Sequence, residues 1–283
     1  MTADALVIDA PRHAPILRLL EAELRWVTRR PRTIAFLAVF ALVPILIAIG
    51  VAVANRSSSR GEGLIAIVAG NGLVLPVVAM SIALSLLLPL AVAMAAADAI
   101  AGESAAGTLR GLLVAPVGRL RLVAMKAFGV LVVAVLATLV IAVVGVLAGL
   151  TVVGLADGSL VTLSGTTVGF GDALARVALA AVWTVGQLVA VGAIALAVSS
   201  ITEHPLVVLA SVLGGIIVFG VLSAIPALDW LQPYLLTSGW TAGADVLRYP
   251  MPLDGLLDST LRALCYTAIG GGLTIARMLR RDA

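Results

Sequence analysis

The sequence predicts an all-α, polytopic membrane protein with six transmembrane helices, and three observations support this fold class. The chain has 283 residues, of which 61% are hydrophobic and 12% charged, whereas a soluble domain usually carries about a quarter charged residues. Its mean hydropathy of +1.17 is too high for a water-soluble fold, because even a large core needs a polar shell. Long uncharged stretches alternate with short charged segments, as expected for apolar spans of about 20 residues joined by loops.

An amphipathic helix is expected over residues 14–32, before the first span. Leu20 and Leu24 share one helical face, while Glu21 and Arg25 on the other face have the i,i+4 spacing and order of a stabilising ion pair. Such a helix lies in the membrane surface, in contact with lipid, rather than crossing the bilayer. It either anchors the chain only or also contacts a cytoplasmic partner.

Six spans are expected in the gaps between charges. They are 33–54, about 73–97, 127–154, 174–199, 206–228 and 260–276. The first would form about 33 Å of helix, enough for a hydrocarbon core of about 30 Å. Pro76 and Pro89 are expected to kink the second span, and Arg262 is expected at the mouth of the sixth.

The orientation follows from the basic residues. Most of the 18 Lys and Arg residues fall before the first span, between spans two and three, and after the sixth span. Because basic residues are enriched in cytoplasmic loops, both termini are expected in the cytoplasm of a plasma-membrane protein. A net charge of +3 distributed in this way indicates membrane topology and no nucleic-acid partner.

The segment 229–258 between spans five and six is expected outside the cell. It contains Trp230, Tyr234, Trp240 and Tyr249, and such side chains prefer the lipid–water boundary. Its prolines exclude one continuous helix. We expect two short re-entrant helices that enter the outer leaflet and turn back, the alternative being an ordinary extracellular loop.

The segment 98–118, between spans two and three, contains the most informative motif. Residues Gly102 to Thr108 nearly form the phosphate-binding loop G-x-x-x-x-G-K, but Thr108 stands where the lysine belongs. Since that lysine contacts the β- and γ-phosphates, no ATP site is expected in the chain. Catalytic, cofactor-binding and metal-binding residues are likewise not expected, and the single Cys265 has no cysteine partner.

Leucines further along this segment predict a short surface helix. Leu109, Leu112 and Leu113 recur at i, i+3 and i+4, and Pro116 marks the end of the helix. Three basic residues are expected to anchor the next span at the lipid headgroups: Arg119, Arg121 and Lys126. On these residues alone, an ordinary cytoplasmic loop is an equal alternative.

The same segment resembles the coupling-helix signature of type-2 ATP-binding cassette (ABC) exporter permeases. The matching string is IAGE–x3–GTL–x2–LL–x2–P–x2–R–x6–K, from Ile100 to Lys126. The amphipathic N-terminal segment, the six spans and the aromatic outer segment also agree. The resemblance therefore covers nearly the whole chain, closely only at 98–126.

This resemblance implies the membrane-spanning subunit of an ABC exporter, a single permease domain over 1–283 that acts with a second permease copy or a paralogue. In that family the helix between spans two and three docks on a separate ABC ATPase (nucleotide-binding) subunit, which would hold the ATP and magnesium. The implied contact residues are Glu103, Gly107, Thr108, Leu109 and Leu112, assisted by Glu21, Glu23 and Arg25. Export is favoured because E-S-A-A-G at 103–107 lacks the spacing of the importers' E-A-A-x3-G loop.

Two other classes of protein fit less well. An ATP-independent secondary transporter needs an intramembrane charge for its coupling ion, and the expected spans contain almost none. A membrane-embedded lipid-modifying enzyme needs clustered acids or histidines. The stretch from Asp172 to Arg176 resembles part of a headgroup-transferase motif without its glycine, and an i,i+4 ion pair explains these two residues better.

A few small and polar residues interrupt the expected spans. Gly145 and Gly149 have the spacing that permits close contact between helices. The polar residues either form hydrogen bonds between helices or line a translocation path. They are Ser81, Ser85, Thr138 and Gln187.

Overall fold

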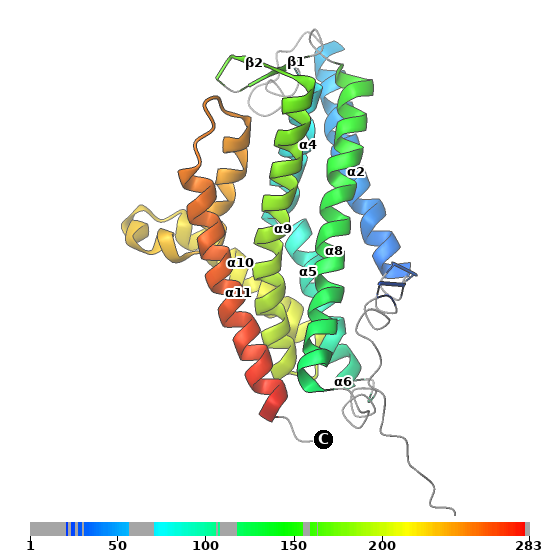
Figure 1. Ribbon diagram of the computed structural model, residues 1–283, viewed down its shortest axis with the longest axis vertical. Helices are drawn as coiled ribbons and strands as arrows, with labels where there is room; N and C mark the ends of the chain where they lie inside the picture. Colours follow the sequence, from blue (N-terminus) through cyan, green and yellow to red (C-terminus); the bar gives the residue numbers. More distant parts are fainter. Residues whose placement is uncertain are drawn as a thin grey trace, which may run out of the picture.

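The structure, a computed structural model, describes residues 21, 24–25, 28–29, 31–56, 71–105, 107, 118–154, 159–162 and 164–280. Long helices run along one axis, with a small hairpin at one end and α6 and the C-terminal end of α11 at the other (Figure 1). The first half contains α2 (Pro31–Arg56), η1 (Gly72–Val74), α4 (Leu75–Ser85), α5 (Leu87–Ala97), the π-helical turn η2 (Asp98–Gly102), α6 (Glu103–Ala105), α8 (Arg119–Ala148) and η3 (Gly149–Val153). The second half contains β1 (Ser159–Val161), β2 (Thr167–Gly169), α9 (Phe170–Ile201), α10 (Pro205–Ser223), the 3-10 helices η4 (Pro226–Tyr234) and η5 (Thr237–Leu247), and α11 (Asp254–Arg280).

In the described part of the chain, five helical segments are long and apolar enough to cross a membrane. They are Pro31–Ala54, Leu87–Ala105, Arg119–Val153, Phe170–Ile201 and Pro205–Ser223. These helices confirm an all-α, polytopic membrane protein. The sixth expected span lies within α11, which at 27 residues is about 40 Å long. Charged residues make α11 less apolar than the other five, so the sixth crossing stays a prediction.

The second expected span is broken in its middle. Helix α4 ends at Ser85 and α5 begins at Leu87, and Leu86 between them has φ −152° and ψ −45°. Pro89 accounts for the break, because it has no N–H for the carbonyl of Ser85 and its ring clashes with that carbonyl. Pro76 lies in the first turn of α4, where a proline is tolerated, so the kink expected at Pro76 was wrong.

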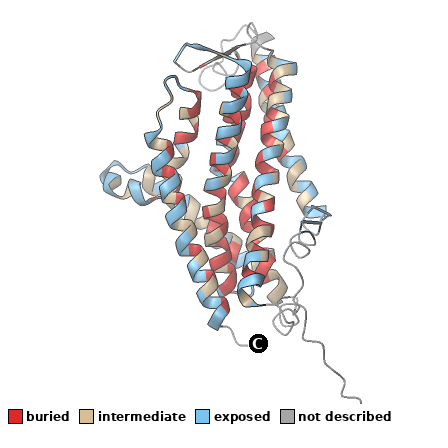
Figure 2. Ribbon diagram, viewed as in Figure 1, coloured by how far each residue is buried: buried red, intermediate tan, exposed pale blue. Residues whose placement is uncertain are grey.

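Helix α9 lies at the centre of the bundle, where it packs against α5, α8, α10 and α11. The buried residues concentrate on the faces that these helices turn toward one another (Figure 2). Small residues on α9, such as the fully buried Ala190 and Ala195, allow this close packing. In a membrane, such close packing stabilises helix pairs because lipid removes most of the hydrophobic driving force between them.

Gly145 of α8 and Gly149 of η3 confirm the close contact expected from their spacing. A Cβ atom at Gly145 would lie 2.8 Å from the ring of Pro76, and one at Gly149 would overlap the carbonyl of Gly72. The N–H of Gly72 also donates to the carbonyl of Gly154 at 3.2 Å. Backbone therefore meets backbone where α8 and η3 pass η1 and α4.

A short antiparallel hairpin is the one departure from an all-α fold in the described residues. Ser159 pairs with Gly169, Leu160 with Val168, and Val161 with Thr167. The hairpin joins the ends of η3 and α9 at the end of the bundle opposite α6 (Figure 1).

Candidate functional site

The start of the segment 98–118 forms a compact turn at one end of the bundle. Helix α5 passes into the π-helical turn η2 and then into α6. Gly107 has φ +72°, a left-handed conformation that glycine adopts without strain. Its N–H donates to the carbonyl of Ser104 at 3.0 Å, which ends the helical turn. Of the implied contact residues, Thr108, Leu109 and Leu112 lie outside the described residues.

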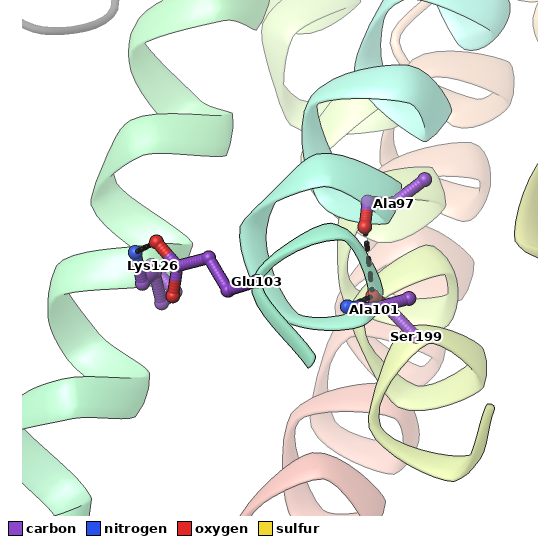
Figure 3. Close-up of polar contacts among 5 residues, drawn as sticks. All are labelled: Ala97, Ala101, Glu103, Lys126 and Ser199. Atoms are coloured by element: carbon purple, nitrogen blue, oxygen red, sulfur yellow. Dashed lines mark hydrogen bonds and ion pairs between the residues drawn. The ribbon is translucent and has the colours of Figure 1, made fainter. Parts of the chain in front are cut away.

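A buried ion pair attaches this turn to α8. The Nζ of Lys126 donates to the Oε1 of Glu103 at 2.5 Å, as Figure 3 shows. The side chains of Lys126 and Glu103 are only 4% and 16% exposed. Lys126 was expected at the lipid headgroups, and that expectation was wrong. The ammonium stays buried because the carboxylate compensates its charge, which is the condition under which buried charges persist.

Ser199 of α9 is inserted into the helical hydrogen-bond ladder of this turn. The N–H of Ala101 donates to the Oγ of Ser199 at 3.0 Å, and this hydroxyl donates to the carbonyl of Ala97 at 3.5 Å (Figure 3). In a regular α-helix, the N–H of Ala101 would bond the carbonyl of Ala97 directly. The hydroxyl of Ser199, which is fully buried, thus bridges the two groups that the π-helical turn separates.

A third contact joins the turn to α2. The guanidinium of Arg32 lies 3.6 Å from the carboxylate of Asp98, and their side chains are 69% and 21% exposed. This pair is weaker than the buried pair, since exposed ion pairs contribute little. The beginning of the segment is therefore connected to three neighbouring helices, α2, α8 and α9. The sequence had singled out neither Ser199 nor the pairing of Glu103.

The N-terminal residues that the structure describes confirm one detail of the amphipathic helix. Arg25 and Glu21 form the expected i,i+4 ion pair at 2.5 Å, with side chains 68% and 60% exposed. Glu23 lies outside the described residues. The exposed pair is available to a partner or to water, and it adds little to stability.

The four polar span residues do not come together. Ser81 and Ser85 bond carbonyls of their own helix, as does Thr138, which bonds the carbonyl of Ala134. Gln187 is 1% exposed, and its amide donates to the carbonyl of Ser259 at 3.4 Å. Ser81 and Ser85 line a groove of about 460 Å³ between α4, α10 and η5, which the other two do not reach. The structure brings together two of the four.

Gln187 belongs to a polar junction between α9 and α11. Trp183, one turn earlier on α9, donates its indole N–H to the Oγ of Ser259 at 3.1 Å. Ser259 itself is 1% exposed. For Gln187, hydrogen bonding between helices, one of the two expected roles, is confirmed.

The outer segment forms two short helices, η4 and η5, as expected from its prolines. Trp230 and Tyr234 are 69% and 67% exposed, as befits rings at a lipid–water boundary. Leu235 and Val246, by contrast, are buried. The segment is thus packed onto the bundle, and its depth in the membrane stays a prediction.

Two arginines hold the outer segment in place. Arg262 of α11 donates through Nη1 to the carbonyl of Leu235 at 2.7 Å and to the Oγ of Ser238 at 2.5 Å. Arg176 of α9 donates to the carbonyls of Val246 and Arg248 at 2.5 and 2.9 Å. The prediction of an ion pair between Asp172 and Arg176 was wrong, because the guanidinium of Arg176 donates to these carbonyls instead.

The fold and this site define a multi-pass membrane protein. At one end of its helical bundle, a joint formed by the polar contacts of Asp98, Glu103 and Ser199 connects the segment 98–118 to the neighbouring helices. The family of ABC-2 family transporter proteins matches residues 17–252. The chain therefore belongs to that family and is the membrane subunit of an ABC transporter. A comparison with curated proteins found no match.

Proposed function

We propose that this chain exports a substrate across the plasma membrane with the energy of ATP hydrolysed by separate ATPase subunits. It acts as a pair of permeases, either two copies of this chain or this chain with a paralogue. Membership of the ABC-2 family supports the proposal, as does the absence of the phosphate-binding lysine at Thr108. ATP and magnesium belong to the ATPase subunits, and the permease supplies the path.

The observation that carries this proposal is the three-way attachment at the start of the segment 98–118. Glu103 is fixed to α8, the backbone at Ala97 and Ala101 to α9, and Asp98 to α2. An ATPase subunit that pushes on the segment therefore displaces the first four spans together. Such a displacement opens and closes a path between the two permeases.

Within this mechanism the residues divide into two groups. Glu103, which the resemblance implies as a contact residue, is given a positioning role here together with Lys126, because their two charges hold the segment against α8. Contact with the ATPase subunit falls to Gly107, Thr108, Leu109 and Leu112, with help from Glu21, Glu23 and Arg25. The C-terminal end of α11 and α6 lie at the same end of the bundle (Figure 1), which supports placing both on the cytoplasmic side with the contact.

A charge placed in the contact tests the coupling. Leu109→Asp or Leu112→Asp introduces a carboxylate into an apolar contact, at a cost of several kcal/mol if the site is fully desolvated. Each variant should lose co-purification with the ATPase subunit and lose transport. Val152→Asp is the matched control, because Val152 is a 45% exposed aliphatic residue in η3, which follows the opposite end of α8. Normal transport and co-purification by both leucine variants would show that the contact lies elsewhere.

The division of labour has its own test. The full chain, purified without its ATPase subunit, should neither bind nor hydrolyse ATP. The proposal for the whole complex would be refuted if the isolated chain hydrolysed ATP at a rate that is proportional to the concentration of the chain and persists after a second purification.

A further inference from the structure

An apolar groove runs along the bundle between α8, α9 and α11. It has a volume of about 500 Å³, within the roughly 300–1,000 Å³ of ordinary ligand pockets. Its lining is aliphatic, aromatic or small, with Phe128 and Leu131 on α8, Gly192 on α9, and Gly271 and Ile275 on α11. The hydroxyls of Thr267 and Thr274, which also line it, already donate to carbonyls of their own helix. The groove therefore suits a hydrocarbon chain.

Two glycines allow the close helix contacts that form this groove. A Cβ atom at Gly270 would lie 2.6 Å from the backbone of Ala193, and one at Gly192 would lie 2.8 Å from Val130. Helix α9 is thus drawn against both α8 and α11, and its buried face forms the floor. A Cβ atom at Gly271 would meet nothing within 4 Å, which leaves space above this floor.

The groove is long enough to hold one acyl chain of a leaflet. Its lining on α8 runs from Leu120 to Ala134, which is about 21 Å of helix. Half of a hydrocarbon core is about 15 Å. The groove begins at the end of α8 next to the segment 98–118 and extends to about the depth of an acyl chain.

Positive charge gathers at that end of the groove. The Nη1 of Arg119 donates to the carbonyl of Leu279 at 2.6 Å, so its guanidinium crosses from α8 to α11. Arg121, two residues further along α8, is exposed. No carboxylate pairs with either arginine among the residues that the structure describes. A guanidinium carries five N–H donors, and basic pockets between helices attract anionic lipid headgroups.

We propose that this groove binds one anionic phospholipid of the leaflet next to α6. An acyl chain lies between α8 and α11 on the floor of α9, and Arg119, whose guanidinium crosses from α8 to α11, binds the phosphate. The lipid bridges α8 and α11 beside the first turn of α8, directly after the segment 98–118. The bound lipid thereby stabilises the resting position of the segment 98–118 relative to α8 and α11.

Filling the groove tests the site of the acyl chain. The full chain is purified with equimolar dioleoyl phosphatidylglycerol and dioleoyl phosphatidylcholine, and retained lipid is counted by native mass spectrometry. Gly271→Leu places a side chain in the groove and should reduce retained phosphatidylglycerol at least tenfold. Gly272→Leu is the matched control, since Gly272 also has nothing within 4 Å and does not line the groove. Retention by Gly271→Leu equal to that of the control overturns the proposal. So does a loss of association between permease copies with lipid content unchanged, which would make the groove a protein contact.

The headgroup is tested separately, and this test holds even if Gly271→Leu fails to fold. Arg119→Gln should abolish the preference for phosphatidylglycerol over phosphatidylcholine, whereas Arg280→Gln at the exposed end of α11 should leave it intact. Both lipids have the same chains, so only headgroup charge distinguishes them. An unchanged preference in Arg119→Gln, or equal binding of the two lipids by the wild type, overturns the proposal.

Discussion

The buried pair of Glu103 and Lys126 predicts an order of stability among three forms of the chain. Lys126→Met leaves the Glu103 carboxylate, which is 16% exposed, without its ammonium partner. Removing one member of a buried pair lowers the free energy of unfolding by about 3–5 kcal/mol. Because Glu103 keeps some exposure to solvent, we expect a loss at the lower end of this range, about 3 kcal/mol. Replacing both residues, as in Lys126→Met with Glu103→Leu, removes both charges and is close to neutral or stabilising.

The assay combines unfolding of the full chain in detergent with transport and ATP turnover by the complex. The single variant should lose about two powers of ten in its folding equilibrium, and the double variant should recover most of that stability. Transport should not recover with it. An apolar contact is non-directional and does not fix the segment against α8 as a charged hydrogen bond does. The double variant is therefore expected to fold and to leave ATP hydrolysis uncoupled.

Two outcomes would refute this reasoning. A loss of only about 0–1 kcal/mol in Lys126→Met would indicate a pair that behaves as an exposed one. Normal transport by the double variant would show that the pair stabilises the fold without transmitting force.

Two further predictions concern the packing of the bundle and its outer segment. Gly149→Ala forces a Cβ atom onto the carbonyl of Gly72 and should lower the free energy of unfolding by about 1–3 kcal/mol in a thermal unfolding assay. Gly214→Ala, where nothing lies within 4 Å, is the control and should be neutral or slightly stabilising. Equal stability of the two variants would disprove the close contact. Arg262→Met removes the charged donor to Leu235 and Ser238, worth about 1.5–3 kcal/mol. In a Cys265→Ala background, an impermeant thiol reagent should then label Leu235→Cys about ten- to a hundredfold faster. Rapid labelling at 235, 236 and 246 without the Arg262 change would show a plain exposed loop.

Much of the fold was predictable because lipid is a demanding solvent. In a bilayer every backbone group must be bonded within the chain, so uncharged stretches of sufficient length can only be helices here. Proline chemistry likewise predicted the break near Pro89 and the two short helices of the outer segment. The error at Pro76 has the same origin, since a proline in a first turn and one in a helix interior look alike until the start of the helix is known.

The joint at the segment 98–118 was not predictable in detail. Lys126 was assigned to the headgroups because a lysine near the end of a span usually extends to the interface. Its partner Glu103 lies 23 positions earlier, outside the i,i+4 spacing that reveals ion pairs within one helix. Ser199 gave no signal at all, since a hydroxyl that bridges another helix's backbone becomes visible only in the packed bundle.

The two strongest contacts of the joint lie on different sides of the turn, and this arrangement determines how it responds to force. In Figure 3, Lys126 approaches from one side and Ser199 from the other. A segment fixed at one point can pivot about that point, so a push at the coupling helix would rotate the segment without displacing the spans. Fixing it both at Glu103 and at the backbone of Ala97 and Ala101 removes that freedom. Loss of either contact should therefore uncouple the transporter, and Ser199→Ala should do so without removing a charge from the bundle.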